Sequence, residues 1–184
     1  IVCGASNMGP GDRVPVALPG AVLPNGTKIK KSKLRGEVSE GMLCSEPELG
    51  LGEDASGLLI LPADAPVGTP LVDYLDLNDT VVELDLTPNR GDCLSIAGVA
   101  REVAALSGRP LGGPRVEAVE AVTDARREVR LEAGPDCPRY LGRVVEGVDP
   151  ARPTPLWLAE RLRRCGVRPV SLLVDITNYV MLEL

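Results

Sequence analysis

The sequence predicts an α+β protein with short strands in its first part and helices in its second. Residues 1–75 are rich in glycine and proline and contain short β-type runs, a pattern typical of small β domains. Two later stretches, 93–107 and 155–165, place apolar residues at helical spacing. No apolar run approaches the roughly 18 residues of a membrane span, so we expect no contact with a membrane.

The β-type runs lie at 14–18, 27–31 and 57–61, and turn signals rich in glycine and proline separate them. Short strands with such frequent interruption are typical of a small β-barrel or sandwich. A further strand is predicted over 80–86, because apolar and acidic residues alternate there.

The next turn, 87–92, leads into a helix expected over 93–107. Asp92 is the predicted N-cap of this helix, and Gly108 is its predicted stop. A helix start could bind an anion, but Asp92 disfavours one, so we favour a structural turn with Arg90 in an ion pair. The apolar stripe expected on this helix consists of Ile96, Val99, Val103 and Leu106.

Strands are expected next over 128–133 and 141–146. The second helix has clear limits in the sequence. Thr154 can cap it, Pro155 suits its first position, and Gly166 can end it.

The composition limits the chemistry open to the chain. It has no histidine, which excludes histidine bases and histidine metal ligands, and we expect no metal site. Its net charge is −6, so DNA is not an expected partner, and contact with RNA needs a local basic patch. The five cysteines lack C-x-x-C spacing, which favours free thiols in a reducing, cytoplasmic setting.

One basic patch is present in this acidic chain. Its members are Lys28, Lys30, Lys31, Lys33 and Arg35. On a strand, Lys28 and Lys30 would share one face and the other three cations the opposite face. The functional interpretation is contact with RNA phosphates, and the structural alternative is a solvated edge strand whose lysines discourage further pairing. The charge pattern alone favours the structural alternative, since aromatic residues for base stacking are nearly absent here.

The final part of the chain joins an apolar run, 170–174, to a polar group and a second apolar run. We expect 170–174 to form a strand, as short apolar runs between polar residues often do. The polar group comprises Asp175, Thr177 and Asn178. These side chains could position water or a ligand amine, or they could satisfy the backbone at a strand end. The residues by themselves leave both interpretations open.

Several segments, taken in order, resemble one known family. The segments similar to the later part of a tRNA-binding oligonucleotide-binding (OB) domain are 1–7, 14–24, 28–35 and 39–45. The segments that resemble the β subunit of bacterial phenylalanyl-tRNA synthetases, at the same relative spacing, are 85–95, 100–104 and 168–183. The motif Asn-Tyr-Val-Met-Leu-Glu at 178–183 is the most specific of them.

The resemblance implies an internal part of that β subunit, and both ends look like cuts through a longer chain. The implied fold is a partial OB-type β-barrel, a strand-turn-helix segment and the start of a mixed α/β editing domain of the B3/B4 type. The implied parts are an OB-fold tRNA-binding domain without its first strands (1–77), a helical segment (78–112), a linker (113–127) and a truncated editing domain (128–184).

The family's whole enzyme attaches phenylalanine to tRNA(Phe) with ATP and Mg²⁺, as an α2β2 tetramer with the synthetase α subunit. Because the α subunit carries the aminoacylation chemistry, the resemblance implies no catalytic residue and no cofactor in this chain. It implies RNA contact by the basic patch, and it casts Thr177 and Asn178 as substrate-positioning residues of a pocket that hydrolyses mischarged tyrosyl-tRNA. The alternative is a stand-alone OB-type tRNA-binding module, or a subunit-interaction part, without catalysis.

Overall fold

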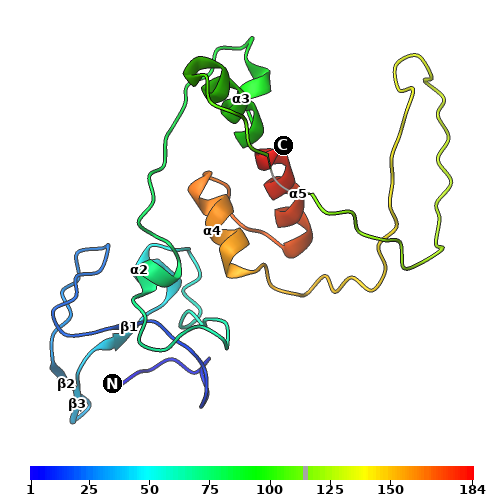
Figure 1. Cartoon of the computed structure of the whole chain (residues 1–184). Helices are drawn as coiled ribbons and strands as arrows, with labels where there is room; N and C mark the ends of the chain where they lie inside the picture. The colour runs from blue at the N-terminus through cyan, green and yellow to red at the C-terminus, as the bar shows by residue number, and fades with distance from the viewer. Residues whose placement is uncertain (114–115) are drawn as a thin grey trace. The chain divides into compact units, whose positions relative to one another are not determined.

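Strands lie in the first part of the described chain and the longer helices in the second (Figure 1), which confirms the α+β class. The computed structural model describes residues 1–113 and 116–184. The predicted linker 113–127 contains residues 114–115, which lie outside the described residues. The described chain divides into two compact units, 1–83 with 163–166 and 84–162 with 167–184.

The first unit contains two small antiparallel sheets. Their strands are β1 (Val16–Ala17) paired with β4 (Met42–Leu43), and β2 (Ser32–Leu34) paired with β3 (Glu37–Ser39). Isolated bridges join Arg13 to Leu61 and Val22 to Lys28. The prediction of a small β domain is confirmed, because two short antiparallel sheets are present. The closed OB-type barrel is not seen, because these sheets do not close into a barrel within the described residues.

The predicted strands of this unit are much shorter in the structure than in the sequence pattern. The run 14–18 contains β1, whereas 27–31 holds only the bridge at Lys28 and 57–61 only the bridge at Leu61. Glycine and proline turns interrupt the pairing, so each run forms few ladder hydrogen bonds.

The β2–β3 connection is a two-residue turn formed by Arg35 and Gly36. Leu34 pairs with Glu37 across it, and φ is 50° at Arg35 and 90° at Gly36. Two positive φ values in a two-residue loop are typical of a type I′ turn, whose twist matches that of the strands. The turn therefore presents the Arg35 side chain at the tip of a hairpin.

The core of the first unit is small. Its buried cluster consists of Ala17, Leu23, Ile29 and Cys44. Two short helices accompany it, α1 (Glu46–Leu49) and α2 (Leu71–Tyr74). The backbone N–H of Ser45 donates to the Glu48 carboxylate at 2.7 Å, which satisfies one donor before α1.

Three further strand predictions are wrong. Residues 80–86, 128–133 and 141–146 belong to no strand in the structure. Within the first of these segments, Val81 and Val82 are exposed. A strand needs a hydrogen-bonded neighbour, and local alternation cannot supply one.

Helix α3 (Ile96–Ser107) follows the single turn η1 (Gly91–Cys93) in the second unit. Its N-cap is Ser95, whose hydroxyl accepts a hydrogen bond from the Gly98 N–H at 3.1 Å. The predicted cap, Asp92, lies instead within η1. Gly108 ends the helix with φ 65°, which confirms the predicted stop.

The apolar stripe predicted on α3 faces solvent over its last turns. Val103 is 58% exposed and Leu106 is 86% exposed. Close packing occurs at the helix start, where Gly98 approaches η1 so tightly that an added Cβ would lie 1.7 Å from the Asp92 carbonyl oxygen. The contact between η1 and α3 therefore depends on a glycine rather than on the predicted stripe.

The last two helices are α4 (Leu156–Arg164) and α5 (Leu172–Glu183). Gly166, with φ 75°, ends α4 as predicted: its N–H donates to Arg163 O at 2.9 Å, and the Val167 N–H donates to Leu162 O at 3.0 Å. The strand predicted over 170–174 is wrong, because α5 already begins within it.

Helices α4 and α5 run side by side in the same direction. The contacts between their segments are Thr154 with Asp175, Trp157 with Tyr179, and Arg161 with Glu183. Because the residue numbers of these contact partners increase together along α4 and along α5, the two helices are parallel. The aromatic rings meet edge to face, with centroids 5.7 Å apart and planes at 88°, a favourable geometry for such pairs.

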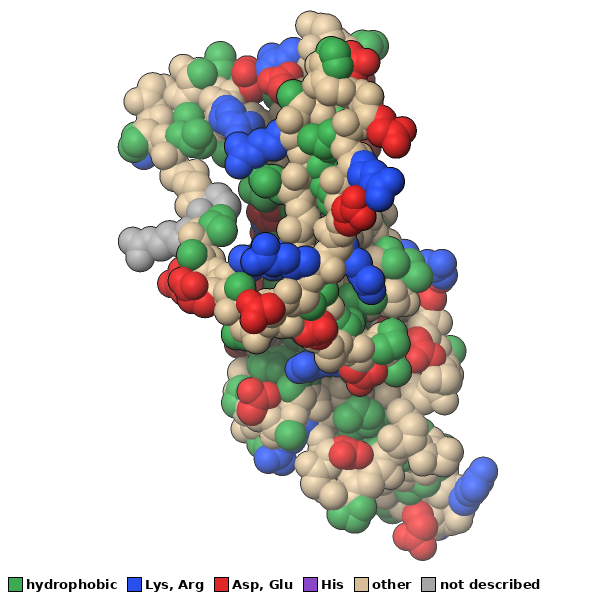
Figure 2. Space-filling model, turned by 90° about the vertical axis from the view of Figure 1, so that its right-hand side faces the viewer, with side chains coloured by type: hydrophobic (Ala, Val, Ile, Leu, Met, Phe, Trp, Pro, Cys, Tyr) green, Lys and Arg blue, Asp and Glu red, His purple; other side chains and the backbone are tan. Residues whose placement is uncertain are grey.

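Charged and apolar side chains are interspersed on the face shown in Figure 2. Within the described residues, no helix combines the length and the apolar character that crossing a bilayer requires. Many large apolar side chains remain exposed, among them Leu94 and Val67. Folding of the described chain therefore leaves much apolar surface uncovered.

Candidate functional site

The basic patch lies on the first unit, and all five of its cations are exposed. Ile29 is buried between Lys28 and Lys30, so these two lysines point away from the core, as alternation predicts. Lys33 lies on β2 opposite Val38, and Arg35 is at the hairpin tip. The structure therefore leaves these four cations accessible to a ligand.

Lys31 differs from the other four cations. Its ammonium group forms an ion pair with the Glu40 carboxylate, and both side chains are exposed. An exposed pair of this kind contributes at most about 1 kcal/mol to stability. It does, however, engage the lysine with an acidic partner on the same hairpin.

The second set of predicted site residues lies on α5. The Thr177 hydroxyl is exposed and donates to the Val174 carbonyl oxygen at 2.7 Å, which leaves its oxygen able to accept a further hydrogen bond. Asn178 is half-buried. Within residues 1–113 and 116–184, its amide has no hydrogen-bond partner, so this side chain is the freer of the two to bind a ligand.

Asp175 lies on the same helix but is fully buried, with 0% of its surface exposed. Its Oδ2 accepts from the Thr154 hydroxyl at 2.5 Å, and its Oδ1 accepts from the Val170 N–H at 2.9 Å. The two open interpretations of the polar group thus separate: Asp175 satisfies the backbone before α5, as the capping interpretation predicts, and Asn178 remains available.

The sequence did not show the pairing of Thr154 with Asp175. Thr154 was a predicted helix cap, but its hydroxyl donates to this carboxylate. The only signal in the sequence is that each residue lies at the start of a helix. Nothing local specifies which distant side chain such a residue meets.

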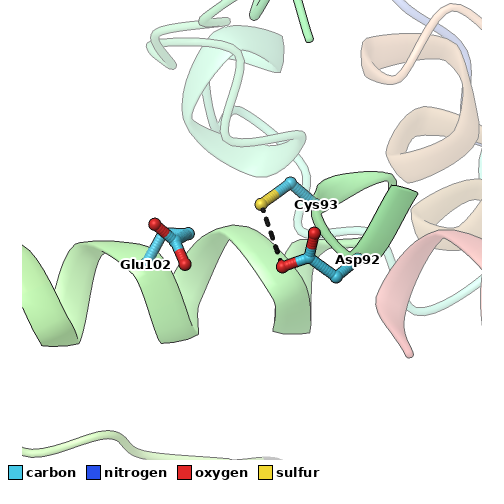
Figure 3. Close-up of side chains that lie close together, drawn as sticks. All are labelled: Asp92, Cys93 and Glu102. Atoms are coloured by element: carbon cyan, nitrogen blue, oxygen red, sulfur yellow. Dashed lines mark hydrogen bonds between the residues drawn. The ribbon is translucent and has the colours of Figure 1, made fainter. Parts of the chain in front are cut away.

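A second polar cluster surrounds Arg90 at the junction of η1 and α3. Asp92, Cys93 and Glu102 bring ligand atoms within 4.8 Å of one another (Figure 3). The Arg90 guanidinium occupies the same place: its Nη2 lies 3.0 Å from Asp92, 2.7 Å from Glu102 and 3.1 Å from the Cys93 sulfur. The ion pair predicted for Arg90 is confirmed. The Arg90 guanidinium is therefore the cation that these carboxylates and the Cys93 sulfur bind.

The charges in this cluster shift its pKa values. Hydrogen bonds from Arg90 hold the pKa of Asp92 below its ordinary value of 3.8, and the bonds to Asp92 and Glu102 raise the pKa of Arg90. Desolvation raises the pKa of the Cys93 thiol above 9.0, although the neighbouring guanidinium opposes this. A thiol with a raised pKa is a poor nucleophile, so the cluster is suited to a structural role.

Two protein-family models match the chain. The model described as "Putative tRNA binding domain" matches residues 1–70, which include the basic patch. The model described as "B3/4 domain" matches residues 136–184, which include Thr177 and Asn178. Both sets of predicted site residues therefore fall within matched regions.

Several relatives align with the chain over its whole length. It is 59% identical over 184 residues to the "Phenylalanine--tRNA ligase beta subunit" of Pseudomonas fluorescens strain Pf0-1. The subunits of the same name from Pseudomonas savastanoi pv. phaseolicola and Pseudomonas syringae pv. syringae are 58% and 59% identical. Each match covers 100% of the chain and 23% of the relative, so the chain spans about a quarter of the relatives' length. Over its whole length the chain is thus similar to one part of the phenylalanine–tRNA ligase β subunit.

Proposed function

We propose that the chain serves a phenylalanine–tRNA ligase in two ways: it contacts tRNA, and it contributes to a site that hydrolyses tyrosine wrongly attached to that tRNA. The similarity at 59% identity over all 184 residues carries the proposal. It is supported by the matches to the two domain families and by the accessibility of the side chains that each region presents.

Hydrolytic correction has a physical reason in such a ligase. Tyrosine differs from phenylalanine by one hydroxyl, and an apolar pocket rejects an added hydroxyl by a factor of only about 100. A second site that removes tyrosine raises the overall accuracy. In this site Asn178 and Thr177 position the aminoacyl group or the attacking water. Neither side chain acts as a nucleophile, and the chain contributes no catalytic residue.

The proposal extends to the whole protein. The complete subunit pairs with an α subunit in an α2β2 ligase of the cytoplasm, and that ligase uses ATP and Mg²⁺ to charge tRNA(Phe). Residues 1–77 form the tRNA-binding part, 78–112 a helical segment, 113–127 a linker and 128–184 the start of the editing part. The basic patch contacts tRNA phosphates, and the chain itself contributes neither a cofactor site nor a metal site.

The decisive experiment uses the full-length β subunit assembled with its α subunit. We expect Asn178→Ala to slow deacylation of tyrosyl-tRNA about tenfold, because one lost hydrogen bond costs about 1–1.5 kcal/mol in the transition state. Phenylalanylation should continue at its normal rate. Val180→Ala, a change of an exposed residue on the same helix, is the matched control. Deacylation by Asn178→Ala at the unchanged rate would reject the editing role.

A second candidate function is tRNA binding or subunit interaction without catalysis. The exposure of all five cations of the basic patch favours it, because that surface needs no hydrolytic site. The two candidates differ in one result. A binding module predicts salt-dependent tRNA binding together with deacylation that is insensitive to Asn178→Ala.

A further inference from the structure

We propose that Thr154 and Asp175 form a latch that sets the orientation of α5, so that both are positioning residues for the hydrolytic site. This inference rests on the proposed function, since it concerns how Asn178 is held. The name "latch" refers to the Thr154 hydroxyl, the Asp175 carboxylate and the Val170 N–H, which the two hydrogen bonds at 2.5 and 2.9 Å connect.

The burial of Asp175 makes the latch specific. A carboxylate with 0% exposure is costly unless it is hydrogen-bonded, and hydrogen bonds to a charged group are the stronger kind. The two described donors come from different segments, one before α4 and one before α5. Any rotation of α5 that moved the carboxylate from either donor would leave a buried charge less well satisfied.

Asp175 also takes the place of a helix cap. The residue at the N-cap position of α5, Ser171, makes no side-chain cap hydrogen bond. Asp175, four residues later, reaches back to the Val170 N–H, and its negative charge lies in the first turn, where the helix dipole favours it. The same carboxylate thus starts the helix and ties it to Thr154.

The latch spans an opening between two loops. A cavity of about 270 Å³ is lined by residues 150–154 and 169–172 together with Asp175. Because open space separates the loops beside the latch, loss of its hydrogen bond would leave them room to move apart. Water entering the cavity could replace the lost donor but could not tie the loops together.

The position of Asn178 follows from the latch. Asn178 lies three residues after Asp175, and residues at this spacing share one side of a helix. The pairs Trp157–Tyr179 and Arg161–Glu183 continue the same parallel alignment toward the end of α5. Holding Asp175 therefore fixes the side of the helix from which the Asn178 amide projects.

The test uses the assembled full-length ligase with Thr154→Val, which keeps the shape and removes the donor, and Thr154→Ser, which keeps the donor. We expect Thr154→Val to lower kcat for tyrosyl-tRNA deacylation about tenfold with KM unchanged, since small displacements of a positioned group can cost up to about 100-fold. Thr154→Ser should stay within about twofold of the wild type. Equal rates for both variants and the wild type would overturn the latch.

A double variant separates positioning from a general structural role. If the latch acts through Asn178, the combination Thr154→Val with Asn178→Ala should deacylate no more slowly than Asn178→Ala alone, because coupled residues are not additive. Multiplied losses would overturn the proposal. Should Thr154→Val fail to assemble, with phenylalanylation also lost, Thr154→Ala serves in its place: it also removes the hydroxyl donor, in a smaller side chain, and the same non-additivity is required.

The single variants also distinguish this inference from the proposed function. If Asn178→Ala slows deacylation and Thr154→Val does not, the latch is wrong and the editing role stands. If Asn178→Ala has no effect, the editing role fails and the latch fails with it.

Discussion

The hydroxyl of Thr154 donates a 2.5 Å hydrogen bond to Oδ2 of Asp175, a residue 21 positions later in the chain. This bond joins the segment before α4 to the first turn of α5. It is followed along the two helices by the Trp157–Tyr179 ring contact and the Arg161–Glu183 ion pair. Asp175 is therefore part of the framework that aligns the two helices.

Gly98→Ala should destabilise the second unit by about 3 kcal/mol, the upper part of the range for overpacking. The new Cβ would lie 1.7 Å from the Asp92 carbonyl oxygen, whereas alanine in an ordinary helix position is favourable by about 1 kcal/mol. Urea unfolding of the chain measures the change. Gly91→Ala, whose Cβ would meet no atom within 4 Å, is the control; similar stabilities for the two variants would contradict the tight contact.

The Arg90–Asp92 pair should make stability depend on acid pH. The folded-state pKa of Asp92 lies below 3.8, so the pair stabilises the fold above that pH, and this contribution disappears as pH falls through the folded pKa. Melting temperatures from about pH 2 to pH 7 for the wild type and Asp92→Asn should therefore converge at the acid end, below the carboxylate pKa range. A constant difference across this range would show that the pair is not the cause.

The basic patch should give tRNA binding a measurable salt dependence. Changing Lys28, Lys30 or Lys33 to glutamine should each reduce the slope of log affinity against log salt by up to about 0.7–0.9. Lys31→Gln should reduce it less, because Lys31 is already paired with Glu40. Fluorescence titration of the full-length subunit with tRNA(Phe) measures the slopes. Equal slopes for all variants and the wild type would show that the basic patch does not contact tRNA.

The cysteines should differ in reactivity according to their surroundings. Cys137 and Cys165 are exposed, whereas Cys44 and Cys93 are buried, and desolvation raises the pKa of both buried thiols. Alkylation at about pH 8 followed by mass spectrometry should label the exposed pair first, since the thiolate is the reactive form. Early labelling of Cys93 would instead show that the η1–α3 junction opens in solution.

Local patterns predicted the existence of α3 and α4 and the residues at which they stop. The stops at Gly108 and Gly166 are confirmed, because a glycine with positive φ can end a helix through hydrogen bonds to residues a few positions away. The capping prediction failed at Asp92, where the turn η1 moved the helix start to Ser95. Both residue types make good caps, so the pattern could not choose between them.

The strand predictions failed for a different reason. The run 170–174 has the composition of a strand, yet α5 begins at Leu172, because a short apolar run does not distinguish a strand from a helix. The segment 80–86 alternates correctly but has no paired neighbour among the described residues. Strands depend on distant partners, and a local pattern cannot report them.

By itself, the sequence determined the helix stops, the basic patch between residues 28 and 35, and the resemblance to phenylalanine–tRNA ligase β subunits. These features depend on residues close together or on the order of motifs. Only the tertiary structure decided that Asp175 is buried against Thr154, that Arg90 holds Asp92 and Glu102 together, and that Asn178 remains unpaired among the described residues. The physical reason is that burial and side-chain pairing depend on which distant segments pack together, and that choice belongs to the whole fold.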